Sequence, residues 1–180
     1  MSVFHTDRLN LRRFRLDDAP FAYELLNMPS WLRFIGDRGA HTLEDARGYL
    51  RNGPLASYRA RGYGLWMVET REHATPLGMC GLVERSELPH PDIGFAFLER
   101  HWGHGYAYEA AAGTLVYAAK TLAMKRVLAI TTLDNERSAR LLEKLGMRHE
   151  ATVRLPSDPE QLRLYAISFG TSPRYADGSR

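Results

Sequence analysis

The stretch HWGHGYAYEAA, residues 101–111, sets two glycines directly in front of a segment with the composition of a helix. A strand pattern, DIGFAFL at residues 92–98, comes just before it. The first N–H groups of a helix have no partners within it and carry partial positive charge, so they attract anions. Glycine lets a phosphate approach the backbone without a Cβ in the way. Six residues are expected to form this anion site: Gly103, His104, Gly105, Tyr106, Ala107 and Tyr108.

The stretch lacks residues that two common classes of phosphate site, the P-loop and the dinucleotide-binding turn, require. A P-loop needs a lysine followed by Ser or Thr after its last glycine, and neither stands here. The dinucleotide pattern G-x-G-x-x-G has its first two glycines at Gly103 and Gly105, but Tyr108 takes the third place. Taken alone, the stretch also fits a tight turn that binds nothing.

The hydrophobic pattern outside the turn predicts an α/β domain of the α+β type. The expected strands are 9–14, 63–70, 76–84, 92–98, 126–132, 148–153 and 161–169. The expected helices are 17–27, 42–51, 105–122 and 136–145, the first of them stopped by Pro29. We therefore expect a mixed, mostly antiparallel, twisted sheet of about seven strands flanked by about four helices. The helix at 105–122 would join two parallel strands.

Length and composition fit one soluble domain. The chain has 180 residues, 44% hydrophobic and 25% charged, which is enough to bury a core. We expect a single domain over residues 1–180, with a core at about 6–168 and a frayed tail at 172–180. The net charge of +3 suits an anionic small ligand. Nucleic acid as a partner gains little support, because the arginines are spread along the chain.

Cysteine usage and hydropathy point to the cytoplasm. Cys80 is the single cysteine, so no internal disulfide can form. The N-terminus lacks the apolar core of a signal peptide, and the most apolar helical stretch, 110–124, is too short to cross a bilayer. We expect a soluble cytoplasmic protein without a membrane partner.

A second motif, DNERSARLLEKLGM at residues 134–147, follows the expected strand at 126–132. With this motif and the glycine turn together, the chain resembles the GNAT superfamily of N-acetyltransferases, in particular its branch of ribosomal-protein N-acetyltransferase-like enzymes. The resemblance runs from about residue 6 to residue 168. It is carried by TDRLNLR at 6–12, PLGMCGL at 76–82, IGFAF at 93–97, WGHGYAYEA at 102–110, and NERS at 135–138 with LGM at 145–147.

The resemblance implies how acetyl-CoA would bind. In that family the glycine turn holds the pyrophosphate, in the pattern Gln/Arg-x-x-Gly-x-Gly/Ala. Two registers fit, one starting at Arg100 and one at Trp102, and we prefer the second. The strand before the turn is expected to separate from its parallel neighbour, so that its backbone pairs with the pantetheine. By resemblance these groups belong to Phe95, Ala96 and Phe97, and Asn135 would bind near the thioester.

The expected chemistry is direct attack of a primary amine on the thioester, through a tetrahedral intermediate. Many members of the superfamily use a tyrosine as the acid, but Leu142 stands at that position. In the ribosomal-protein branch a serine is the proposed donor, and Ser138 fits that role or a capping role in its helix. Glu84 and Asp92 are candidate bases. Each is also explained as a solvated turn residue or a partner for Arg85 or Arg100, and a water-mediated route needs neither.

Several alternatives remain open from the sequence. His101 and His104 suggest a metal, but no ligand stands beside them at suitable spacing, so no metal is expected. A non-catalytic acyl-CoA-binding module on the same fold is the rival to an enzyme. Residues 29–62 would shape the acceptor pocket, with Trp31 and Phe34 (and Tyr63 just beyond) as candidate walls. The acceptor is left open between a protein N-terminus, an aminoglycoside, a polyamine and an amino acid. The branch also allows a homodimer.

Overall fold

The computed structural model describes residues 2–170, so the frayed tail predicted at 172–180 lies outside the described residues. One sheet runs through the molecule in the strand order β1-β2-β3-β4-β5-β6-β8-β7. Its strands are β1 (Ser2–His5), β2 (Leu9–Arg12), β3 (Leu65–Thr70), β4 (Pro76–Val83), β5 (Asp92–Phe97), β6 (Arg126–Thr132), β7 (Arg148–Arg154) and β8 (Gln161–Ser168). All neighbouring pairs are antiparallel except β5 with β6, so the expected mixed sheet is confirmed.

The strand count of about seven was one short within residues 2–170, where the sheet has eight strands. The additional strand is β1, four residues that pair with β2. A strand of four residues has too few alternations to stand out from the pattern of the sequence. Its stability comes from its partner β2 and from the ring of Phe4, which stacks on Tyr117 at 5.2 Å between ring centroids.

The helix count of about four was also low. The described residues form α1 (Ala19–Leu26), α2 (Pro29–Phe34), α3 (Leu43–Asn52), α4 (Pro54–Arg61), α5 (Tyr106–Lys120) and α6 (Glu136–Lys144). The two that the pattern missed, α2 and α4, both begin with proline. Pro29 does stand beyond the end of α1, as predicted, but it also opens the next helix. Proline is well suited to a first helical position, because its fixed φ is already helical and no N–H is needed there.

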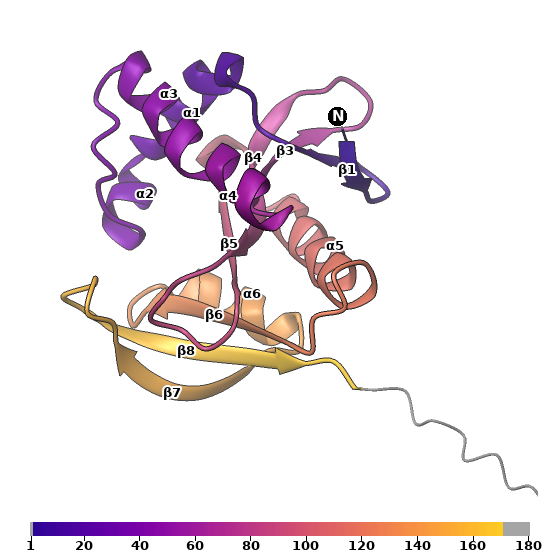
Figure 1. Cartoon of the computed structure of the whole chain (residues 1–180), viewed down its shortest axis with the longest axis vertical. Helices are drawn as coiled ribbons and strands as arrows, with labels where there is room; N and C mark the ends of the chain where they lie inside the picture. Colours follow the sequence, from indigo (N-terminus) through magenta and orange to yellow (C-terminus); the bar gives the residue numbers. More distant parts are fainter. Residues whose placement is uncertain (1, 171–180) are drawn as a thin grey trace, which may run out of the picture.

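The helices cover both faces of the sheet, and β3 shows how the sequence directs this. Trp66 and Val68 point into one core, where α5 and α6 contribute Ala111, Leu115 and Leu142. Met67 points into the other core, with residues of α1 and α3. This alternation is the period of two that a strand buried on both faces requires. Figure 1 shows α1–α4 gathered together and α5 apart from them, with β5 between.

The parallel pair β5 and β6 meets at one end and then separates. Asp92 and Leu128 are the one pair in register within the described chain, and the Leu128 N–H donates to the Pro91 carbonyl at 2.9 Å. Beyond this point β5 continues through Phe97 with β4 on one side. The other edge of β5 is left without a strand, and the separation expected from the resemblance is present.

Candidate active site

A cleft of about 1310 Å³ opens where β5 and β6 separate. The glycine turn and the start of α5 border one side of it, and residues of α2, α3 and α4 border the other. The cleft is therefore lined by segments from most of the chain, and it is large enough for an extended ligand together with a second, smaller molecule.

The glycine turn has the backbone that its sequence predicts. Gly103 and Gly105 have φ values of +81° and +79°, in the left-handed region that side chains disfavour. A Cβ on Gly103 would meet nothing within 4 Å, so conformation rather than space requires glycine there. The helix α5 begins at Tyr106, immediately after Gly105. The first N–H groups of α5 therefore lie at the border of the cleft, and so does the positive end of the helix dipole.

A side-chain clamp holds this turn against the start of the chain. The Glu109 carboxylate accepts hydrogen bonds from the Thr6 hydroxyl at 2.6 Å, the Arg8 N–H at 2.9 Å and the Arg8 Nε at 2.7 Å. The Arg8 guanidinium also donates to the His104 carbonyl at 3.0 Å and lies over the Tyr106 ring. Sequence reasoning noted Thr6 and Arg8 only as part of a resembling segment. Their role depends on contacts about a hundred residues apart, which no local pattern reveals.

The open edge of β5 offers alternate backbone groups to the cleft. The Leu98 N–H donates to the Leu77 carbonyl of the neighbouring strand at 2.9 Å. Because bonded and non-bonded pairs alternate in an antiparallel ladder, Ala96 also faces β4 with its backbone groups, and Phe95 and Phe97 face away from it. The Phe97 carbonyl accepts a hydrogen bond from the Trp102 indole at 2.8 Å. The Phe95 N–H and carbonyl and the Phe97 N–H therefore face the gap.

Positive charge gathers on the side of the glycine turn. The Arg137 guanidinium lies 4.2 Å from the centroid of the Trp102 ring, and Lys144 Nζ lies 4.7 Å from that of Tyr108. Both cations come from α6 and border the cleft. The sequence analysis missed them, although their spacing of seven residues on one helix face was a usable signal.

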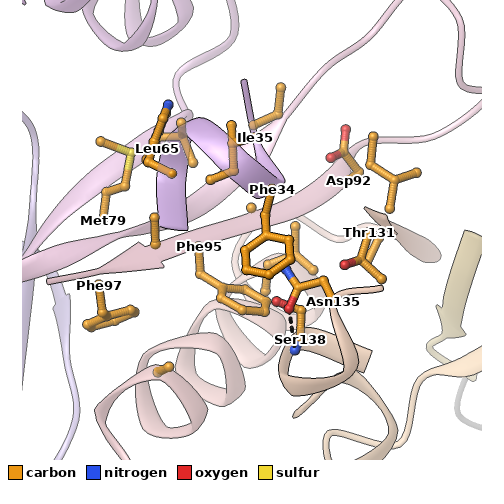
Figure 2. Close-up of a pocket in the computed structure, with 18 of the residues that line it drawn as sticks. Phe34, Ile35, Leu65, Met79, Asp92, Phe95, Phe97, Thr131, Asn135 and Ser138 are labelled. Atoms are coloured by element: carbon orange, nitrogen blue, oxygen red, sulfur yellow. Dashed lines mark hydrogen bonds between the residues drawn. The ribbon is translucent and has the colours of Figure 1, made fainter. Parts of the chain in front are cut away.

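Asn135 and Ser138 lie together at the mouth of β6. The Asn135 side chain caps α6 by accepting a hydrogen bond from the Ser138 N–H at 3.1 Å. Capping in this helix is thus done by Asn135, and the Ser138 hydroxyl makes no hydrogen bond to another described residue. Figure 2 shows the pair below the Phe34 ring, with Phe95 alongside. Both side chains border the cleft.

Thr131 adds a polar group that the sequence analysis did not consider. Its residue is 7% exposed, and its Oγ1 is buried without a hydrogen-bond partner within the described chain. The side chain lies on the cleft side of β6, near Asn135 (Figure 2). A buried hydroxyl without a partner is costly, so a ligand or a water is expected to bind it.

The two candidate bases, Glu84 and Asp92, are both paired with arginines. Asp92 pairs with Arg85, one of the two partners expected, whereas Glu84 pairs with Arg61, and Arg100 pairs with Glu24 instead. Glu84 accepts from Arg61 Nε at 3.1 Å and from the Tyr63 hydroxyl at 2.7 Å, and its side chain is 45% exposed. Asp92 accepts from Arg85 Nε at 2.9 Å, and its side chain is 2% exposed. Burial raises the pKa of Asp92, and Arg85 offsets part of that rise. Both carboxylates border the cleft.

Of the other residues considered in the sequence analysis, some line the cleft and some do not. Of the six residues expected in the turn, five line the cleft and His104 does not; its imidazole stacks on Tyr106. Trp31 and Phe34 line the cleft, whereas Tyr63 packs against the core and reaches only Glu84. Leu142 is buried in the core at 1% exposure.

Within residues 2–170, no group of three or more His, Cys, Asp or Glu side chains is placed to hold a metal ion. No helix in the same part of the chain is long and apolar enough to cross a membrane.

Comparison with known proteins now decides the family. The sequence profile described as "Acetyltransferase (GNAT) domain" matches residues 8–148, most of the chain. The chain belongs to the GNAT acetyltransferases. The family identified from the sequence is confirmed, and with it an acyltransferase with the GNAT fold. Enzymes of this family use acetyl-CoA.

Individual relatives agree with the family. The uncharacterized N-acetyltransferase YoaA of Bacillus subtilis is 27% identical over 154 residues, which cover 84% of this chain and 86% of YoaA. An acetyltransferase structure from Agrobacterium tumefaciens is 26% identical, with a TM-score of 0.78, and covers 92% of this chain and 94% of its own.

A ribosomal L7/L12 α-N-protein acetyltransferase, RimL, solved in complex with coenzyme A, shares the fold at 17% identity. Its TM-score is 0.74, over 93% of this chain and 98% of its own.

Proposed function

We propose that this GNAT acetyltransferase binds acetyl-CoA along the open edge of β5 and transfers the acetyl group to a primary amine. The observation that carries the proposal is the continuous path from that edge to the glycine turn. Free backbone groups on Phe95 and Phe97 lead directly to the N-terminus of α5. An extended, amide-bearing chain ending in phosphates matches this order of groups, because its amides can pair as an added strand would.

The phosphate end would be held mainly by backbone. Gly103, Gly105, Tyr106, Ala107 and Tyr108 border the cleft and present the α5 N-terminus, and Arg137 and Lys144 add positive charge beside them. The His104 carbonyl does not bind the phosphate; it accepts a hydrogen bond from Arg8 and so helps to keep the turn in shape. The structure of RimL with coenzyme A supports a CoA site in this fold.

The acetyl end would lie at the mouth of β6, near Asn135 and Ser138. The amine nitrogen attacks the thioester carbonyl carbon, the carbonyl oxygen takes the negative charge, and the C–S bond then breaks. The Ser138 hydroxyl, which has no partner within the described residues, gives its proton to the departing sulfur. The amine loses its own proton to water, and the Ser138 oxygen regains one from the same source.

Glu84 is better suited than Asp92 to receive the amine proton through water. Its carboxylate is partly exposed at the cleft, whereas Asp92 is enclosed and bonded to Arg85. Tyr63 is not a competing acid, because its hydroxyl donates to Glu84 at 2.7 Å and its side chain does not line the cleft.

Thermal unfolding with and without acetyl-CoA, with ATP and NAD as controls, is the first test. A ligand at 100 times its dissociation constant stabilises the folded state by about 2.7 kcal/mol. For a chain of this size, this corresponds to a rise in Tm of roughly 5–10 °C. An equal rise with ATP, or none with acetyl-CoA, contradicts the proposed site.

Ser138→Ala then separates catalysis from binding. We expect kcat to fall about 100-fold, the lower range for loss of a positioned proton donor. The acetyl-CoA-induced shift in Tm should not change, because Asn135 caps the Ser138 N–H and the variant keeps that bond. Unchanged turnover would exclude Ser138 as the donor, and a parent chain that binds acetyl-CoA but acetylates no amine would be an acyl-CoA-binding module.

A further inference from the structure

The acidic side chains that border the cleft are nearly all neutralised by arginines. Three of these ion pairs involve arginines that line the cleft themselves: Glu84 with Arg61, Asp92 with Arg85, and Asp134 with Arg33. Glu136 pairs with Arg163, and Asp158 accepts a hydrogen bond from the Glu160 N–H. A polycationic acceptor such as a polyamine or an aminoglycoside would therefore find little free negative charge here.

The basic side chains, in contrast, exceed the acidic ones. Arg137, Arg140 and Lys144 lie along α6, on the side of the glycine turn. Arg38 lies on the opposite side, in the segment between α2 and α3, and makes no ion pair with a described residue. Its guanidinium makes one long contact, at 3.4 Å, with the Ile35 carbonyl. We call the side of the cleft bordered by α2, α3, α4 and the segments between them the acceptor side. Arg38 is thus a cation available to a ligand on the acceptor side.

Arg85 is held so that its outer donors remain available. Its Nε donates to the buried Asp92 carboxylate at 2.9 Å, and its two Nη groups make no hydrogen bond to a described residue. Hydrogen bonds from Ser157, and to a smaller extent the charge of Arg85, lower the pKa of Glu87. Both Glu87 carboxylate oxygens are already occupied by Ser157. A guanidinium fixed through Nε presents its remaining N–H groups in a fork that suits a carboxylate.

Tyr49 of α3 completes this group. Its hydroxyl makes no hydrogen bond to a described residue, and the side chain borders the cleft. Tyr49, Arg38 and Arg85 line the same cleft. Burial raises the pKa of Tyr49 to about 12, and the charges of Arg38 and Arg85 act in the opposite direction. The hydroxyl consequently stays protonated and can donate a hydrogen bond.

Apolar side chains form the rest of the acceptor side. Phe34 and Ile35 come from α2 and its end, while Leu65 and Met79 come from β3 and β4 (Figure 2). In Figure 2 the Phe34 ring is seen in front of Asn135 and Ser138, and all three residues line the cleft that would hold the thioester. This wall suits an apolar body between the reacting amine and the arginines.

From this arrangement we propose that the acceptor is a primary amine that carries a carboxylate, namely a free amino acid with an apolar side chain. Arg38, Arg85 and Tyr49 would bind the carboxylate, and Phe34 and its neighbours would pack against the side chain. Asp92 would then be a positioning residue for Arg85. This inference rests on the proposed acetyl transfer and adds the class of acceptor to it.

The test compares acceptors that differ only in charge. Acetylation of leucine, methionine, phenylalanine and tryptophan is measured beside that of their primary amides and of peptides that begin with the same residues, by release of free CoA. We expect at least one amino acid to exceed its amide in kcat/KM by about tenfold, the value of one charge-assisted hydrogen bond. Equal or faster acetylation of every amide, preference for the peptides, or no turnover of any free amino acid overturns the proposal.

Variants then identify the groups responsible. In Arg38→Gln and Tyr49→Phe we expect the ratio of amino acid to amide to fall toward one, and in Arg38→Lys to recover in part. Comparing this ratio between variants cancels the different basicity of the two amines. Arg47→Gln is the matched control, because Arg47 is exposed on α3, pairs with Glu44 and lies outside the cleft. A ratio that Arg38→Gln leaves unchanged would contradict the proposed contact.

The acetyl-CoA-induced shift in Tm is recorded for the parent and each variant. If the parent shows no shift, the proposed function fails before any acceptor is considered. If the shift is present and amides are acetylated as well as amino acids, only the acceptor class is wrong.

Discussion

The two sides of the cleft differ in the chemical groups that border it. On the side of the glycine turn the cleft is bordered by backbone groups, namely the open edge of β5, the turn itself and the first N–H groups of α5, together with the side chains of Arg137 and Lys144. On the acceptor side it is bordered by side chains from α2, α3, α4 and the segments between them. Backbone groups are common to every sequence that adopts the fold, whereas side chains change with each substitution. From this difference we expect substitutions to change the preference for the acceptor more readily than the binding of acetyl-CoA.

This contrast predicts that substitutions on the two sides act on different quantities. Changes near the turn should alter acetyl-CoA affinity and stability together, because the turn is held in shape by the rest of the fold. Changes on the acceptor side should alter the KM for the acceptor and leave acetyl-CoA binding as it was.

The largest expected effect is from Glu109→Gln, which removes the charge at the centre of the clamp. Its carboxylate accepts three hydrogen bonds from Thr6 and Arg8, and its side chain is only 18% exposed. We expect a loss of about 2 kcal/mol in the free energy of unfolding, with Arg8 half exposed and its contribution reduced by solvent. Acetyl-CoA affinity should fall as well, since Arg8 also holds the His104 carbonyl. Urea unfolding and acetyl-CoA titration measure the two effects.

The same residue predicts a pH dependence. Burial alone would raise the pKa of Glu109, but the bonds from Thr6 and Arg8 together outweigh burial and lower it. A carboxyl with a lowered pKa in the folded state stabilises the protein above its unfolded pKa of about 4.3. That stability is lost as the pH falls through the folded pKa. The parent should therefore lose more stability in acid than Glu109→Gln, and identical acid profiles would contradict the clamp; Glu72→Gln, on an exposed turn, is the control.

Gly103→Ala is the next in size and has a close match elsewhere in the chain. Gly103 and Gly146 have φ values of +81° and +85°, and a Cβ on either would meet nothing within 4 Å. Each alanine should cost about 1 kcal/mol in stability from its backbone conformation. Only Gly103 borders the cleft, so only Gly103→Ala should lower the affinity for acetyl-CoA, by about tenfold. Equal affinities in the two variants would show that the turn has no role in binding.

On the acceptor side, Phe34→Ala should raise the KM for the acceptor about fivefold, from loss of roughly 1 kcal/mol of apolar contact. The dissociation constant for acetyl-CoA should not change. Leu32→Ala is the control, because Leu32 lies on the same helix, is 42% exposed and does not border the cleft. Loss of acetyl-CoA binding in Phe34→Ala would mean that the two sides are not separate.

The smallest expected effect is from Thr131→Val. The Thr131 hydroxyl is buried without a partner within the described chain, so replacing it by a methyl group should stabilise the free protein by about 0.5 kcal/mol. Thr114→Val should do the reverse and destabilise by about 1 kcal/mol, because the Thr114 hydroxyl donates to the Ala110 carbonyl at 2.8 Å. Thermal unfolding of both variants without ligand checks the pair. A destabilised Thr131→Val would reveal a partner for that hydroxyl.

The sequence was informative where structure depends on near neighbours. The predicted strand at 126–132 has the same bounds as β6, and the turn at 103–105 has the positive φ values that its glycines allow. Asn135 and Ser138 were placed together correctly, because three residues at a helix start are neighbours by geometry.

Contacts between distant segments were beyond the reach of such patterns. Arg33 and Asp134 are 101 residues apart in sequence and 2.9 Å apart in space. Thr6 and Glu109 are separated by a similar stretch of chain. The acceptor side consists largely of contacts of this kind, so its shape and its excess of positive charge became apparent only from the fold.

The clamp between Thr6, Arg8 and Glu109 determines whether the segment that carries the glycine turn could function outside this fold. The segment from β5 through α6 contains the strand edge, the glycines, the helix N-terminus and Ser138, which are the groups proposed above to act on acetyl-CoA. Its turn is nevertheless held in shape by residues that precede it by nearly a hundred positions. We therefore expect that this segment would not keep the shape of its turn in another protein. Grafting it onto another scaffold, or shortening the first strands of this one, would remove the support of the turn and leave every residue of the motif in place.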